Sequence, residues 1–189
     1  MTELVRIEEP EPLLLTVNDY RVLADAGAFA GRSKVELIEG VILTVSPQRK
    51  WHWAVKSELA RRIGNKLEEL GLPLRAGAEG TVKLSENSAP EPDIVIASLS
   101  GDWDAYLGGG EVKLMIEIAD TSEKFDLGKK RLLYARHGIP EYWVLTRQLI
   151  YCFWGPAEND YRHQDKRAFG QPIASATISD LTVETAGIL

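Results

Sequence analysis

The segment VKLMIEIA, residues 112–119, decides how this chain is interpreted. Its residues are nearly all apolar, which is typical of a central strand that other elements cover on both faces. A second segment of this kind, DIVIA at residues 93–97, precedes it and follows Pro92. Each segment carries one acid, Asp93 or Glu117, and a carboxylate inside a buried strand is costly unless a partner such as a divalent cation binds it. The two segments therefore predict two central strands and a metal site.

Side-chain direction places each acid on one face of its strand, because side chains alternate between the two faces. Glu117 shares its face with Met115, whereas Ile118 lies on the other face, and Asp93 shares its face with Val95. If the strands are neighbours in register, we expect the two acids to converge on one Mg²⁺, which prefers carboxylate oxygen.

A helix is predicted after the second strand, over residues 123–137. Asp126, Lys130 and Tyr134 follow one another at every fourth position of it. Successive members drift by about 40° around a helix, so that all three lie on one side. Asp126 and Lys130 alone would be an ordinary ion pair on an exposed helix face, and Tyr134 could simply fill the core. Next to the two acidic strands, they are candidates for the same site.

The remaining elements alternate between helices and strands. Helices are expected over residues 17–24, with Thr16 as N-cap, and over residues 50–70, where apolar residues keep helical spacing. The turn Glu39-Gly40 predicts a hairpin between strands 35–38 and 41–45. Further strands are expected over residues 74–78, 80–84, 141–145 and 149–154, with one more strand and an edge segment in 161–189. This order predicts the α/β or α+β class and a single domain over residues 1–189.

Length and composition exclude several classes of protein. The chain has 189 residues, of which 44% are hydrophobic and 26% charged, as expected for one globular domain. No apolar stretch approaches the roughly 20 residues of a membrane span, and residues 1–12 are acidic, so we expect a cytoplasmic protein without a membrane partner. Cys152 is the only cysteine, which excludes a disulfide and a thiolate zinc cage and indicates a core residue. The net charge of -6 argues against a general nucleic-acid binder.

Glu36 and His52 are weaker candidates for the site. Glu36 lies in the first hairpin strand, and His52 lies between Trp51 and Trp53 at the start of the long helix. A histidine between two tryptophans is more often a packed residue than a ligand. The sequence contains no local signature of a nucleophilic triad and no glycine-rich phosphate loop that follows a strand and opens a helix.

Several short segments in a fixed order carry a family resemblance. They are Glu36-Leu37-Ile38-Glu39-Gly40, Ser46-Pro47 followed by His52, Pro92-Asp93-Ile94-Val95, Glu117-Ile118-Ala119-Asp120-Thr121-Ser122, Asp126 with Lys130 and Tyr134, and Gly138-Ile139-Pro140-Glu141-Tyr142-Trp143. Together they resemble the Uma2-type family of restriction-endonuclease-like nucleases, in the PD-(D/E)xK nuclease superfamily. The resemblance implies a restriction-endonuclease-like core, in which helices flank a central mixed β-sheet.

The resemblance also implies metal ligands. In that superfamily an Asp and a Glu on adjacent strands ligate Mg²⁺, and these would be Asp93 and Glu117 here, with Mn²⁺ as an alternative ion. Glu36 would be an auxiliary acid that helps to hold the metal. His52 would line the site.

The catalytic lysine implied by the resemblance is Lys130, which would position the attacking water. The superfamily pattern places this lysine two residues after the Glu, where the chain has Ala119. The role is therefore expected to have moved to the helix, with Asp126 and Tyr134 supporting the site.

The function implied by the resemblance is a Mg²⁺-dependent endonuclease that hydrolyses phosphodiester bonds in DNA and acts as a homodimer. Two alternatives stay open. One is a noncatalytic module that binds nucleic acid or a protein partner on the same fold, which the acidic net charge favours. The other is a carboxylate-pair hydrolase with a different substrate. The aromatic pairs Tyr142-Trp143 and Phe153-Trp154 could form the dimer contact or belong to the core.

Overall fold

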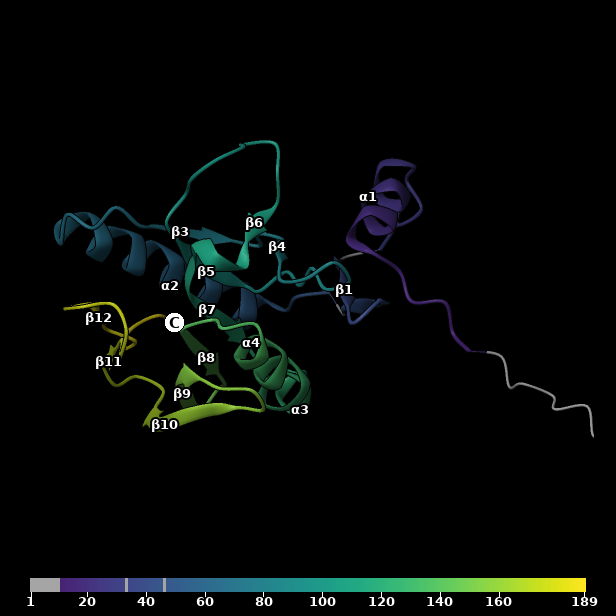
Figure 1. The fold of residues 1–189 in the computed structure, drawn as a ribbon. Helices are drawn as coiled ribbons and strands as arrows, with labels where there is room; N and C mark the ends of the chain where they lie inside the picture. The colour runs from purple at the N-terminus through teal and green to yellow at the C-terminus, as the bar shows by residue number, and fades with distance from the viewer. Residues whose placement is uncertain (1–10, 33, 46) are drawn as a thin grey trace, which may run out of the picture.

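A mixed six-stranded sheet forms the centre of the computed structural model, which describes residues 11–32, 34–45 and 47–189 (Figure 1). The strand order is β10-β9-β8-β7-β5-β3. The strands are β3 (Arg75–Ala78), β5 (Ile94–Ala97), β7 (Val112–Ile118), β8 (Glu141–Leu145), β9 (Leu149–Pro156) and β10 (Tyr161–Ala168). β7 and β8 are parallel and the other neighbours antiparallel, which confirms the predicted fold class. The acidic residues 1–10, and Ser46 of the family segments, lie outside the described ranges.

Helices cover both faces of this sheet. On one face, Val55 and Ile63 of α2 (Lys50–Glu69) pack in one core with Ile116 of β7. On the other face, Leu133 of α4 (Arg131–Arg136) packs in a second core with Met115 of β7. None of the helices in the described residues is long and apolar enough to cross a membrane.

The N-terminal elements form a third, smaller core. Here α1 (Val17–Asp25) packs on the hairpin of β1 (Lys34–Ile38) and β2 (Val41–Val45). Thr16 caps α1 as predicted, because its hydroxyl accepts the amide hydrogen of Asp19 at 3.1 Å while the Asp19 carboxylate accepts the Thr16 amide at 2.9 Å. The remaining short elements are β4 (Val82–Lys83), β6 (Leu107–Gly108), the 3-10 turn η1 (Gly109–Glu111), β11 (Ile173–Ala174) and β12 (Thr182–Val183).

The turn between β1 and β2 confirms the predicted hairpin and depends on Gly40. Both turn residues have positive φ, 50° at Glu39 and 78° at Gly40, as a tight hairpin turn requires. A Cβ added to Gly40 would lie 2.6 Å from the Cβ of Leu14. The Gly40 carbonyl also accepts the Leu15 amide at 2.9 Å, so that the N-terminal segment lies directly on the turn.

We expect Gly40→Ala to lower the free energy of unfolding by at least about 1–2 kcal/mol, because the left-handed backbone costs that much for a residue with a Cβ. The contact with Leu14 adds to the loss. Urea denaturation measures it. The matched control is Gly64→Ala in α2, where an added Cβ meets no atom within 4 Å, and where alanine should instead stabilise by about 0.5–1 kcal/mol. Equal effects of the two substitutions would contradict the account of the turn.

The helix predicted over residues 123–137 contains a π turn. It runs through α3 (Glu123–Phe125), the π turn η2 (Asp126–Lys130) and α4, and the Arg131 amide donates to the Asp126 carbonyl five residues earlier. A π turn takes more residues per turn than an α-helix and is frequent at functional sites. Asp126 and Lys130, at its two ends, are both buried.

The aromatic pairs belong to the core. Tyr142, Trp143 and Phe153 are buried, and Trp154 is half-buried against the core under α2. Tyr142, Trp143 and Phe153 therefore cannot form an apolar dimer contact, because their side chains are already covered within the chain. Cys152 is also a buried core residue, as predicted.

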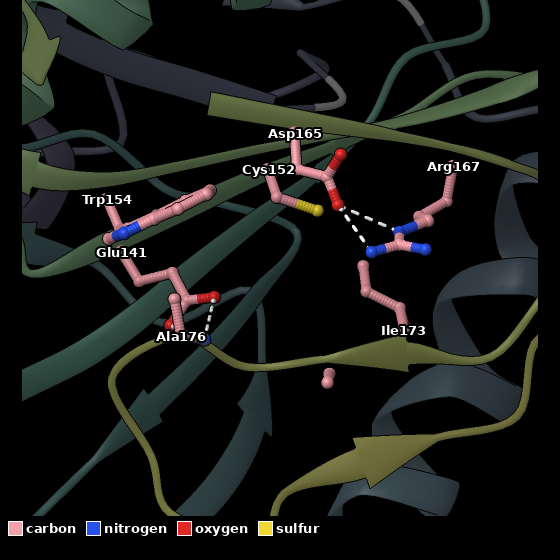
Figure 2. Close-up of a pocket in the computed structure, with 8 residues that line it drawn as sticks. Glu141, Cys152, Trp154, Asp165, Arg167, Ile173 and Ala176 are labelled. Carbon is pink, nitrogen blue, oxygen red and sulfur yellow. Dashed lines mark hydrogen bonds and ion pairs between the residues drawn. The ribbon is translucent and has the colours of Figure 1, made fainter. Parts of the chain in front are cut away.

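The buried carboxylate of Glu141 attaches the C-terminal segment to the sheet. Glu141 is fully buried and accepts a hydrogen bond from the Ala176 amide at 3.0 Å (Figure 2). It also accepts the Thr177 amide at 3.0 Å and the indole of Trp143 at 2.7 Å. The hydroxyls of Ser175 and Thr177 donate to it as well. This loop connects β11 with β12, which contacts α2 and extends the first core.

Candidate active site

A cavity of about 1150 Å³ collects the acids and the lysine that the sequence singles out. Its lining comes from the β1–β2 hairpin, the start of α2, the residue directly before β5, the end of β7, and the π turn. Of the candidate residues, those that line it are Glu36, His52, Asp93, Glu117, Asp126 and Lys130. Tyr134 lies behind the lining, where its hydroxyl donates to Glu117 at 3.0 Å. The structure therefore brings together every residue of the predicted site.

Asp93 and Glu117 lie opposite one another on neighbouring strands. β5 and β7 are antiparallel, and Ile94 pairs with Ile116. Asp93, which precedes Ile94, therefore lies across from Glu117, which follows Ile116. The Ile118 amide donates to Asp93 Oδ2 at 2.8 Å, which holds this carboxylate against β7. Both acids therefore lie on the face of the sheet that α4 covers, as the alternation of side chains along the strands predicts.

Lys130 lies between two buried acids. Its Nζ is 2.9 Å from Glu117 Oε1 and 3.0 Å from Glu36 Oε1, and all three side chains are almost completely buried. Among the described residues, Lys130 forms no ion pair with Asp126, so the interpretation of these two as an exposed surface pair is wrong. Burial alone would lower the pKa of Lys130, but the attraction of Glu117 and Glu36 outweighs it and holds the pKa well above its usual range. Lys130 is therefore a permanent cation at neutral pH.

The pKa of Glu117 is raised as well, because burial disfavours the charged form of an acid. The charge of Lys130 opposes this effect of burial, and the negative charges of Asp93 and Asp126 add to it. One oxygen, Oε1, accepts both the Lys130 ammonium and the Tyr134 hydroxyl. Tyr134 is thus more than core filling, because it fixes the direction of this carboxylate.

Asp93 is held in its charged form. His52 Nε2 donates to Asp93 Oδ2 at 2.9 Å, and Lys34 Nζ lies 3.6 Å from Oδ1. Burial acts to raise the pKa of Asp93, but the hydrogen bond from His52 and the charge of Lys34 together lower it to about 2. His52 is a partner of the acid and not merely a residue packed between two tryptophans.

Glu36 and Asp126 complete the acidic lining. Glu36 Oε1 accepts the Glu91 amide at 3.1 Å, while its Oε2 is buried without a hydrogen-bond partner among the described residues. Asp126 accepts the Ser122 hydroxyl, and burial raises its pKa, with the charges of neighbouring acids adding to the effect and Lys130 opposing it. An unpartnered buried carboxylate oxygen is costly, and a cation would relieve it.

Lys34 is the site residue that the sequence interpretation missed. Its Nζ lies 3.7 Å from Glu36 Oε1 in addition to its contact with Asp93. The signal was available, because Lys34 stands two residues before Glu36 on one strand and so shares its face.

The carboxylates fit a divalent cation. Within the part of the chain that the structure describes, no three His, Cys, Asp or Glu side chains already form a ligand group. Mg²⁺ does not need one, since it commonly binds through one or two carboxylates and keeps its other positions for water and substrate phosphate. Asp93 and Glu117 supply such a pair, and the unpartnered Glu36 Oε2 is a further oxygen donor of the right chemistry.

Comparisons with known proteins identify a family and a similar fold. A family model described as "Uma2: Putative restriction endonuclease" matches residues 17–186. A solved structure from Anabaena variabilis ATCC 29413, described as a "putative nuclease belonging to DUF820", superposes with a TM-score of 0.66 at 18% sequence identity. The match covers 92% of this chain and 96% of that chain, and at this identity it shows a shared fold. No curated protein matches the chain.

Proposed function

The chain belongs to the Uma2 family, and from this premise we propose that it is a metal-dependent endonuclease that hydrolyses phosphodiester bonds in DNA. One observation carries the proposal: Asp93 and Glu117 lie opposite one another on adjacent strands in a large cavity, with a lysine bonded to the second acid. The family description, a restriction endonuclease, names the same chemistry. The proposal adds the metal and the DNA substrate.

Asp93 and Glu117 would hold Mg²⁺ or Mn²⁺, with Glu36 as an auxiliary acid. When bound, such an ion stabilises charge on a phosphoryl oxygen and lowers the pKa of a coordinated water.

The other residues orient the acids. The His52 side chain and the Ile118 amide both donate to Asp93 Oδ2, and neither of them contacts Oδ1. Tyr134 fixes Glu117 in the same way. Lys130 is protonated at neutral pH and cannot accept a proton from water, so its contribution is to position Glu117 and Glu36 and to add positive charge near the reacting phosphate.

We expect the purified protein to nick and then linearise supercoiled plasmid DNA in Mg²⁺ or Mn²⁺ and to be inactive in EDTA. Asp93→Asn and Glu117→Gln should each reduce the rate by more than about a hundredfold, since even groups that only orient metal ligands are worth about 10–100-fold. The control is Asp165→Asn, which removes a half-exposed acid paired with Arg167 on β10 and should leave the rate unchanged.

Calorimetric titration with Mn²⁺ separates the alternatives. Absence of Mn²⁺ binding together with absence of DNA cleavage would instead favour the noncatalytic module, because a pure interaction module need not bind a metal at Asp93 and Glu117. Cleavage that is equal in wild type and in both site variants would contradict the proposed site.

A further inference from the structure

The basic side chains along the cavity differ in what they are free to bind. Lys34, Arg49, His52 and Lys130 all line it. Lys130 is engaged at hydrogen-bond distance with two acids, and His52 with Asp93. Arg49 is exposed at the N-cap of α2. Lys34 therefore stands out as the cation next to the acids that does not hydrogen-bond them.

The geometry of Lys34 leaves its donors unused. Its two acid partners lie 3.6 and 3.7 Å from Nζ, beyond the usual range of about 2.7–3.2 Å for such a hydrogen bond. Only 11% of the side chain is exposed. Among the described residues, no acceptor takes a hydrogen bond from this ammonium, which belongs to a side chain that lines the cavity. The position suits a ligand that brings its own acceptor oxygens.

The neighbours of Lys34 indicate which ligand this is. The ammonium lies near Asp93 Oδ1, the oxygen that neither His52 nor the Ile118 amide contacts. Lysine binds phosphate as a point charge, and charge-assisted hydrogen bonds to phosphate oxygen are short and strong.

We propose that Lys34 binds the substrate directly, by donating to a nonbridging oxygen of the phosphodiester that enters the cavity beside Asp93. Lys34 and Lys130 then have different roles. Lys130 holds the acids in place, and Lys34 receives the phosphate. This inference rests on the proposed function, because it places a phosphodiester in the same cavity.

The test measures binding without turnover. Short fluorescent oligonucleotides, single-stranded and duplex, are titrated with protein in Ca²⁺, and fluorescence anisotropy gives Kd over a series of salt concentrations. We expect Lys34→Gln and Lys34→Met each to weaken binding about tenfold or more. They should also reduce the slope of log Kd against log salt by about one, as the loss of one phosphate contact does. Lys34→Arg should restore most of the affinity and the wild-type slope.

Lys66→Gln is the matched control, because Lys66 pairs with Glu69 near the far end of α2 and is absent from the cavity lining. Thermal unfolding of each variant establishes that it is folded. If Lys34→Gln does not fold, Lys34→Met provides the measurement of binding and of salt slope. A salt slope unchanged in the folded Lys34 variants would overturn the proposal, even with weaker binding, because a purely structural lysine would leave the slope as it is. Absence of any binding by the wild type would overturn it too.

The cleavage assay distinguishes this inference from the proposed function. If binding depends on Lys34 but no DNA is cut with any metal, the nuclease activity fails and the phosphate contact stands. If DNA is cut while Lys34→Gln binds like the wild type, only the inference about Lys34 fails.

Discussion

Lys130→Met should lower the free energy of unfolding of the metal-free protein by about 3–5 kcal/mol, as measured by urea denaturation at neutral pH. Methionine has a similar length but no charge, so the substitution leaves Glu36 and Glu117 without the ammonium that lies 3.0 and 2.9 Å from them. Both carboxylates are almost completely buried. The loss of stability therefore comes mainly from two buried acids that remain without a cationic partner.

Lys129→Met is the matched control for this prediction. Lys129 is the preceding residue of the same π turn, but its side chain is 41% exposed and pairs with Glu39 at the surface, at 3.1 Å. Exposed pairs of this kind contribute up to about 1 kcal/mol. Similar losses for Lys129→Met and Lys130→Met would contradict the view that burial of the acids makes Lys130 essential to stability.

The parts of the fold that could be predicted from the sequence are those that local chemistry determines. The Thr16 cap, the Glu39-Gly40 turn and the apolar spacing of α2 all depend on residues within a few positions of one another. The order of the strands does not. β8 lies between β7 and β9 and runs parallel to β7, and no short pattern records such a pairing between distant segments. The π turn was also missed, because its one glycine, Gly128, is tolerated in an α-helix as well.

The candidate site divides in the same way. The face of Asp93 and of Glu117 follows from strand alternation, so their placement opposite one another could be anticipated once the strands were taken as neighbours. The contact of Lys130 with Glu36 could not be anticipated in this way, because Glu36 lies 94 residues away in the sequence. Asp126, at ordinary helical spacing from Lys130, is the partner that the local pattern indicates. Local spacing suggested a surface pair, whereas the tertiary structure turns the ammonium inward to two distant acids.

Glu141 shows a further limit of sequence patterns. It begins a strand, where an acid is unremarkable, and the groups that explain its burial lie about 35 residues later in the loop before β12. These groups are mostly backbone amides and small hydroxyls, which are uncharged and so leave no recognisable pattern in the sequence. Unlike Glu36 and Glu117, Glu141 is satisfied by neutral donors, and its surroundings are those of a structural anchor.

Glu141→Ala should therefore cost at least about 3 kcal/mol and release the C-terminal segment from the sheet. The substitution removes the acceptor of the Ala176 and Thr177 amides and of the Trp143 indole, and each buried donor left without a partner costs about 1–3 kcal/mol. Urea denaturation measures the total loss. Amide hydrogen exchange locates it, because Ala176 and Thr177 should lose protection while the amides of β7 keep theirs.

Glu184→Ala is the matched control, since Glu184 belongs to the same C-terminal segment but is exposed. It should change the stability by less than about 0.5 kcal/mol, as is usual for surface substitutions. Because β11 and β12 contribute Ile173 and Val183 to the core beneath α2, release of the segment also exposes apolar surface, so the slope of unfolding free energy against urea should fall in Glu141→Ala. An unchanged slope together with full protection of Ala176 and Thr177 would mean that the apolar contacts hold the segment without the carboxylate.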